Sequence, residues 1–230
     1  MKRVLSPLAV LGFLAVSVPA MAVPSRVMFG FTSSSTVDLV IDGSTVIHAA
    51  DTGWYSSLGF HDSLNDNYFV GLCDDDCGPV GEFHDFAVFD LGEGVSATSA
   101  VIRLFNPLTP FAGYISPNPS ELFRLYDVST GLRDLMADQS DATDIFADLG
   151  SGLVFGSATV SAADDGFYVE IALTAEGLDS LSRAVGSWGV GGALDLSREP
   201  GPEPEPVPEP TTLLLLGSGL ILGRRLRKRA

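Results

Sequence analysis

The sequence predicts an all-β fold, an antiparallel β-sandwich of about eight or nine strands with one or two short helices. Short apolar or alternating runs dominate the middle of the chain, and Gly, Asn, Asp and Ser separate them. Two runs place apolar residues at every second position: Ala100, Ile102 and Leu104 share one face of the first, and Phe167, Val169, Ile171 and Leu173 share one face of the second. Helical patterns are few by comparison, and this combination is typical of a two-sheet domain.

Nine segments have the length and residue types expected of strands. They are Thr36–Ile41, Val46–Ala49, Tyr68–Leu72, Phe86–Leu91, Ala100–Phe105, Leu122–Val128, Leu153–Val160, Phe167–Leu173 and Gly189–Leu196. Asp42-Gly43 lies between the first two segments, and Asp165-Gly166 lies between the seventh and the eighth. Asp-Gly suits the type I′ turn of a tight hairpin, because both central residues of that turn need a positive φ angle. We therefore expect two β-hairpins at these positions.

Two segments carry the pattern of short helices. Asp141–Leu149 follows Ser140, and Ala175–Val185 follows Thr174. Serine and threonine are favoured at the N-cap, where the hydroxyl accepts a hydrogen bond from a free backbone N–H of the first turn. The sequence therefore predicts Ser140 and Thr174 as N-caps.

Residues 1–22 have the three parts of a secretory signal peptide. Lys2 and Arg3 form a positive start, Val4–Val18 is an apolar segment, and Ala20 and Ala22 supply the small residues of a cleavage site. We expect this helical segment to direct export through the Sec translocon and to be removed by signal peptidase. The mature chain would then begin near Val23.

The C-terminal end is also divided into three parts. Residues 199–210 are a Pro/Glu-rich linker, residues 211–223 are a hydrophobic membrane segment and residues 224–230 are a basic tail. Alternate prolines favour an extended polyproline II spacer of roughly 30 Å. A Lys/Arg cluster beside an apolar helix stays on the cytoplasmic side of the membrane. The residues that set this orientation are Arg224, Arg225, Arg227, Lys228 and Arg229.

This C-terminal arrangement resembles the PEP-CTERM signal of Gram-negative bacteria, with the motif at Pro208, Glu209 and Pro210. The resemblance implies recognition by exosortase, an intramembrane cysteine transpeptidase. It also implies a transient single-pass anchor in the inner membrane, followed by delivery to the cell surface or the extracellular matrix. The body resembles exported domains of unknown function that accompany such signals, in segments such as Asn67–Gly71 and Phe86–Leu91.

The charge of the chain excludes one class of partner. Seven of its 13 Lys and Arg residues lie in the two ends. The exported region between them therefore contains six arginines and 29 acidic residues. A surface of this kind repels phosphate backbones, so we expect no nucleic-acid partner. Residues 23–198 have the length of one domain, and we expect them to form the acidic β-sandwich.

Cys73 and Cys77 are the two cysteines of the chain, and Asp74, Asp75 and Asp76 separate them. Compartments outside the cytoplasm are oxidising, so two cysteines in an exported chain are expected to pair in a disulfide. Metal binding through the two thiolates and a redox motif are the alternatives. Both lack supporting sequence context, because no second cysteine pair exists and the spacing leaves three residues between the thiols.

Acidic residues around this loop form a candidate calcium site, with Asp62, Asp66, Asp74 and Asp76 as the expected ligands. Calcium takes six to eight oxygen ligands, and carboxylates supply most of them. The spacing follows no known calcium-loop pattern, and a solvated acidic loop is the alternative interpretation. No other cofactor is expected.

Three aromatic residues form a candidate sugar-stacking platform, with Trp54 and Tyr55 in one expected loop and Tyr114 in another. The alternative is that these rings close one end of the hydrophobic core. The histidine–acid pairs His61-Asp62 and His84-Asp85 cannot act as internal dyads on a strand, because adjacent side chains point to opposite faces.

These observations favour a non-enzymatic structural protein of the cell surface or the extracellular matrix. The first alternative is a carbohydrate-binding module for exopolysaccharide, which an exposed row of aromatic rings would support. The second is a polysaccharide hydrolase, which would need two carboxyl groups about 5 to 9.5 Å apart in a cleft.

Overall fold

The computed structural model describes residues 26–73 and 80–197 of the chain. The elements below all lie in one compact unit, Met1–Leu194, and a second unit begins at Asp195. The strands are β1 (Val27–Ser33), β2 (Val37–Ile41), β3 (Thr45–Ser56), β4 (Asn67–Cys73), β5 (Gly81–Gly92), β6 (Ala100–Asn106), β7 (Glu121–Asp127), β8 (Val154–Val160), β9 (Phe167–Ala172) and β10 (Gly186–Leu194). The helices are η1 (Ser34–Thr36), α1 (Leu132–Leu135), α2 (Thr143–Leu149), η3 (Ala162–Asp164) and α3 (Ala175–Arg183).

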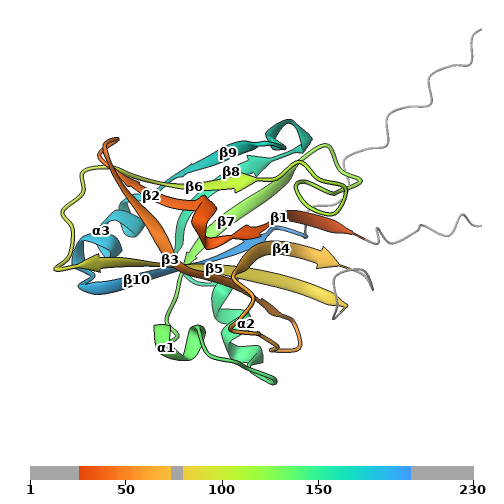
Figure 1. The fold of residues 1–230 in the computed structure, drawn as a ribbon, viewed down its shortest axis with the longest axis horizontal. Coiled ribbons are helices and arrows are strands. Elements are labelled where there is room, and N and C mark those ends of the chain that lie inside the picture. The colour runs from red at the N-terminus through yellow and green to blue at the C-terminus, as the bar shows by residue number, and fades with distance from the viewer. Residues whose placement is uncertain (1–25, 74–79, 198–230) are drawn as a thin grey trace, which may run out of the picture. The chain divides into compact units, whose positions relative to one another are not determined.

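The strands form the predicted antiparallel β-sandwich (Figure 1). The first layer, here called sheet A, has the strand order β8-β7-β10-β5-β3, and β4 and β1 continue it from β5. The second layer, here called sheet B, has the order β3-β2-β6-β9. Every pair of neighbouring strands is antiparallel.

Strand β3 belongs to both layers and forms the corner between them. Its first half pairs with β2, and its second half, after an irregularity between Ala49 and Asp51, pairs with β5. Bulges of this kind let one strand bend from one sheet into the next. At the opposite side β8 and β9 approach each other, and a Cβ atom added to Gly156 would lie 2.7 Å from the side chain of Ile171. The two sheets therefore come close to a closed barrel.

Alternation along the strands builds two hydrophobic cores on the two faces of sheet A. One face turns inward to sheet B, and Phe83, Ala87 and Phe89 of β5 are buried there. The other face carries α1 and α2, which Figure 1 shows below the sheet. The residues of this outer core are Tyr55, Phe86, Val88, Leu135, Ile145 and Leu149.

All nine predicted strands exist, but the structure adds β1 and extends β3 and β5. The alternation of β1 is interrupted at Gly30 and Phe31, whose φ angles are 99° and 84° and whose pairing with β4 shifts register. This irregularity removes the regular pattern by which a strand is recognised in a sequence. The short helix α1 was also not predicted.

The two predicted hairpins have different outcomes. Asp42 and Gly43 have φ angles of 47° and 67° and lie in the turn that joins β2 to β3, so this hairpin is confirmed; Ile41 pairs with Thr45, which makes the loop one residue longer than a two-residue type I′ hairpin. The hairpin predicted at Asp165-Gly166 is wrong, because β8 pairs with β7 while β9 pairs with β6. Helix η3 carries the chain across, and the Gly166 N–H donates to the carbonyl of Asn106 at 2.7 Å.

The two predicted helices are present as α2 and α3. The Thr174 hydroxyl accepts a hydrogen bond from the Gly177 N–H at 3.3 Å, which confirms the expected N-cap of α3. The predicted N-cap of α2 is wrong: the helix begins after Ala142, two residues beyond Ser140. In the described part of the chain, no helix has both the length and the apolar character needed to cross a membrane. The expected signal helix and hydrophobic C-terminal helix lie outside the described residues.

Candidate functional site

A groove of about 460 Å³ opens on the surface where α3, β8 and β10 meet the segment before α1. Two aromatic rings form its floor: Trp188 of β10 and Phe155 of β8 stack with centroids 6.1 Å apart. Both rings are buried, whereas Leu153 at the margin of the groove is 57% exposed. The groove therefore has the size and the apolar base typical of small-ligand sites.

Polar and charged groups surround this floor. Helix α3 contributes Glu176, Asp179 and Arg183, and the Arg183 guanidinium lies 2.9 Å from the Asp179 carboxylate. The Trp188 indole N–H donates to the Ser180 hydroxyl at 3.2 Å, which fixes the ring against α3. Carboxylate, hydroxyl and guanidinium groups on a rim can form hydrogen bonds with a hydroxyl-rich ligand.

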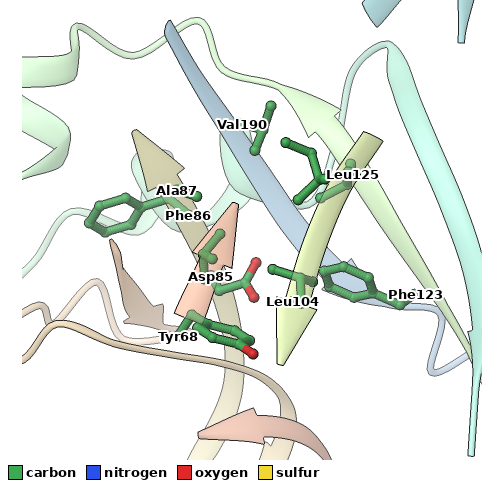
Figure 2. Close-up of a pocket in the computed structure, with 10 residues that line it drawn as sticks. Tyr68, Asp85, Phe86, Ala87, Leu104, Phe123, Leu125 and Val190 are labelled. Carbon is green, nitrogen blue, oxygen red and sulfur yellow. The ribbon is translucent and has the colours of Figure 1, made fainter. Parts of the chain in front are cut away.

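A second feature lies inside the sandwich, where Asp85 of β5 faces sheet B (Figure 2). The cavity beside it has a volume of about 10 Å³, roughly the space of one water molecule. Figure 2 shows the carboxyl group between Leu104 and the Tyr68 ring. The lining residues are Val37, Tyr68, Asp85, Phe86, Ala87, Ile102, Leu104, Phe123, Leu125 and Val190.

The surroundings of Asp85 change the pKa of its carboxyl group. Apolar side chains make up the lining apart from Tyr68, so burial raises the pKa of the Asp85 carboxyl to about 8. Burial, with a smaller contribution from the charge of Asp85, also raises the pKa of the Tyr68 phenol. Gly192 on the neighbouring strand provides room for the carboxyl, because a Cβ atom there would lie 2.2 Å from Asp85 Oδ1. Asp85 is therefore protonated and uncharged in the folded state at neutral pH.

A third feature is a row of charged residues across the outer face of sheet B. Cross-strand pairing aligns His48, Asp38, Arg103 and Glu170 on β3, β2, β6 and β9 in that order. Asp38 accepts a hydrogen bond from Arg103 at 2.7 Å, and His48 Nδ1 lies 2.7 Å from its other oxygen. The Arg103 guanidinium also lies 4.8 Å from the centroid of the Tyr168 ring. The hydrogen bond with Asp38 raises the pKa of Arg103.

The aromatic residues predicted as a sugar platform are buried. Trp54 and Tyr55 lie in strand β3 rather than in a loop, and their exposed fractions are 5% and 0%. They point to opposite faces, because Trp54 packs against Phe83 while Tyr55 packs under α1. Tyr114 is also buried, and its hydroxyl donates to the carbonyl of Asn118 at 2.8 Å. The three rings therefore belong to the packed interior of the domain. The prediction of a sugar-stacking platform is corrected: these residues pack, as in the alternative interpretation.

The predicted calcium ligands are only partly described. The Asp62 carboxylate accepts a hydrogen bond from the Leu64 N–H at 3.0 Å, and the Asp66 carbonyl accepts one from the Thr52 hydroxyl. Asp74 and Asp76 lie outside the described residues. Among residues 26–73 and 80–197, no group of three or more metal-binding side chains occurs. The calcium site remains a prediction.

Cys73 ends β4 and is buried among Met28, Trp54, Phe69 and Phe83. Its expected partner Cys77 lies outside the described residues, so the disulfide remains a prediction. The other predicted positions outside the described residues are Ala20, Ala22, Pro208, Glu209, Pro210, Arg224, Arg225, Arg227, Lys228 and Arg229.

The histidines have structural roles. The His84 ring stacks on Phe146 of α2 at 3.9 Å, while Asp85 points into the sandwich, as expected for neighbours on a strand. The His61 ring stacks on Tyr55 at 4.8 Å, and burial lowers its pKa. The groove and the charged row were not predicted, because each is assembled from segments far apart in the sequence.

Comparison with known proteins identifies the C-terminal end. Residues 206–229 match the PEP-CTERM protein-sorting motif. This match implies an exported protein that passes through a membrane-anchored stage and is processed by exosortase. No curated protein matches the chain.

Proposed function

We propose that this protein is a non-enzymatic structural component of the cell surface or the extracellular matrix. The observation that carries the proposal is the PEP-CTERM motif at residues 206–229, which assigns the chain to exosortase processing. A protein with such a sorting signal acts outside the cytoplasm, and its globular part is the β-sandwich.

The structure of the sandwich supports a display role. Its two sheets approach each other between their end strands β8 and β9, so each of these strands lies beside the other rather than at an open edge. The large excess of acidic residues keeps such a domain soluble and limits nonspecific association. A domain of this kind suits dense display on a Pro-rich stalk.

The sorting step can be tested with two matched variants of the full chain. The linker contains another Pro-Glu-Pro sequence, Pro202–Pro204, that lies outside the matched motif. Replacing Pro208, Glu209 and Pro210 by alanine should leave export intact and cause the unprocessed form to accumulate in the inner membrane. The same replacement at Pro202–Pro204 should leave processing unchanged. Cell fractionation with immunoblotting measures both results, and normal release of the first variant would contradict the proposal.

The groove beside Trp188 favours carbohydrate binding as a second candidate function. Its volume of about 460 Å³ accommodates one or two sugar rings, and its rim offers Glu176, Asp179 and Ser180 as hydrogen-bonding groups. A hydroxyl-rich chain from the surrounding exopolysaccharide is the ligand that this chemistry suits. Trp188 and Phe155 are 5% and 2% exposed, so the apolar surface offered to the C–H faces of the sugar is that of Leu153 at the margin, which is 57% exposed.

A glycan array with the purified protein tests this second function. Changing Glu176 and Asp179 to alanine should reduce binding to any retained glycan at least tenfold, whereas Asp62→Ala, an exposed acid elsewhere, should not. An array without retained glycans would remove the carbohydrate-binding candidate. Release of reducing ends from a bound glycan would instead support the polysaccharide-hydrolase alternative.

A further inference from the structure

The two sheets of the sandwich differ in how their outer faces are covered. Helices α1 and α2 pack on the outer face of sheet A, and their side chains form a core with it. Sheet B has no such layer in the described part of the chain, and Figure 1 shows β2, β6 and β9 along the upper side of the molecule. The outer face of sheet B is therefore available to a partner.

The side chains on this face are largely apolar. The pairing register aligns Val46, Val40, Val101 and Ala172 in one row across the four strands, here called the valine row. On the other side of the charged row, Phe105 and Tyr168 form an aromatic pair with ring centroids 5.3 Å apart. Val46 is 46% exposed and Tyr168 is 45% exposed. Solvent-facing strand positions are usually polar, so these two apolar rows mark an interaction surface.

The charged row lies between the two apolar rows, and basic and acidic residue types alternate along it. In strand order it reads His48, Asp38, Arg103 and Glu170, so a basic residue and an acidic residue alternate from β3 to β9. With histidine counted as neutral, this row carries one negative charge, whereas the chain as a whole carries a formal net charge of −16 on the same count. A strongly basic partner would be attracted by the remaining acidic surface rather than by this face.

We infer that the outer face of sheet B is a self-association surface, and that its partner is a second copy of this chain. A two-fold axis parallel to the strands, between β2 and β6, reverses the order of the charged row in the facing copy. His48 then faces Glu170 of the second copy, and Asp38 faces Arg103. An axis along the row would place each charge against itself, so electrostatics selects the first arrangement.

The same axis matches the apolar rows. It keeps the position along the strand unchanged, so the valine row of one copy packs on the valine row of the other, and the aromatic pairs lie on the same side. Sheets that pack face to face keep their strands within about 30° of each other, which preserves the order of the rows. The interface is therefore isologous, meaning that both copies use the same residues.

The size of this face predicts a weak contact. Four strands about 4.8 Å apart, with about five residues each at 3.3 Å per residue, present a face roughly 17 Å on each side. Two such faces cover roughly 600 Å² in total, which is below the range of stable specific interfaces and in the range of weak, transient contacts. Many copies attached to one surface raise the effective concentration, so a contact of this strength is sufficient there.

Sedimentation velocity of the full-length protein in detergent micelles tests this inference. Wild-type protein should show concentration-dependent dimerisation. Val46→Lys, which places a charge in the valine row, should weaken it at least tenfold. Glu170→Lys should weaken it about as strongly, because the new positive charge would face the basic His48 of the other copy. A mixture of wild type and Glu170→Lys should show intermediate affinity, because one of the two symmetric contacts is kept.

Val185→Lys is the matched control, because Val185 is 74% exposed in the segment after α3. It should dimerise like wild type, and melting temperatures should confirm that each variant folds. A protein that is monomeric at every concentration would overturn the inference. Dimerisation unchanged by Val46→Lys and Glu170→Lys would also overturn it, and would place the contact elsewhere. Neither result would affect sorting, so the proposed function is tested independently.

Discussion

Two aspartates of this domain are equally buried but are accommodated in opposite ways. Asp38 on the outer face of sheet B is 3% exposed, and Arg103 and His48 contact its two oxygens. Asp85 inside the sandwich is 5% exposed, and no basic side chain lines its cavity. A buried carboxyl group must either be paired or lose its charge. Asp38 is accommodated by pairing, whereas Asp85 is accommodated by holding its proton.

The largest expected effect concerns the proton on Asp85. Its pKa is about 8 in the folded state, whereas an aspartate in an unfolded chain titrates near 3.9. Between these values the folded state binds more protons, so the free energy of unfolding falls as pH rises, by at most about 1.4 kcal/mol per pH unit. This contribution is complete below pH 4 and is lost by about pH 8.

The variant Asp85→Asn removes this dependence, because an amide resembles the protonated carboxyl and does not titrate. It should match wild type near pH 4 and exceed it near pH 8 by up to about 5 kcal/mol. Urea denaturation at pH 4, 6 and 8 measures the difference between the two proteins. Parallel pH profiles for wild type and variant would show that Asp85 is not held in its protonated form.

The same substitution at Asp38 should have the opposite sign. Asp38→Asn leaves the Arg103 guanidinium without its carboxylate, and because that side chain is 32% exposed, the cost should be about 2–3 kcal/mol, below that of a fully buried ion pair. Urea denaturation at pH 7 gives the value directly. Stabilisation by both substitutions would contradict the distinction between the two aspartates.

A smaller loss is expected from Gly192→Ala in β10. The new Cβ would lie 2.2 Å from Asp85 Oδ1 and 2.7 Å from the Phe123 ring, so the interior must shift. Overpacking of this kind costs about 1–3 kcal/mol. Ser187→Ala, an exposed position in the same strand, is the control, and denaturation midpoints compare the two. A neutral Gly192→Ala would show that the space around Asp85 is not restricted.

The smallest effect is expected at His48. Its side chain is 72% exposed although it contacts Asp38 at 2.7 Å, and exposed pairs contribute at most about 1 kcal/mol. His48→Ala should therefore lower the free energy of unfolding by less than about 1 kcal/mol at pH 7. A loss as large as that of Asp38→Asn would show that Asp38 depends on His48 as much as on Arg103.

The sequence predicted the sandwich because alternation and the Asp42-Gly43 turn are local signals, whereas Asp165-Gly166 predicted a pairing of β8 with β9 that the structure does not have. It missed β1, where Gly30 and Phe31 interrupt alternation, and it placed Trp54 in a loop because β3 runs seven residues beyond the predicted end at Ala49. The separation of His84 from Asp85 followed from strand geometry. The row that joins His48, Asp38 and Arg103 was not predictable, because it depends on the register of three strands.

The position of the last strand determines how the domain would respond to a pulling force. β10 ends at Leu194, shortly before the Pro-rich linker, and it pairs with β5 on one side and β7 on the other. Antiparallel hydrogen bonds lie perpendicular to the strands, so tension along β10 loads both ladders in shear. Many bonds must then fail together rather than open one by one. A domain pulled along this strand would therefore be held by both ladders at once.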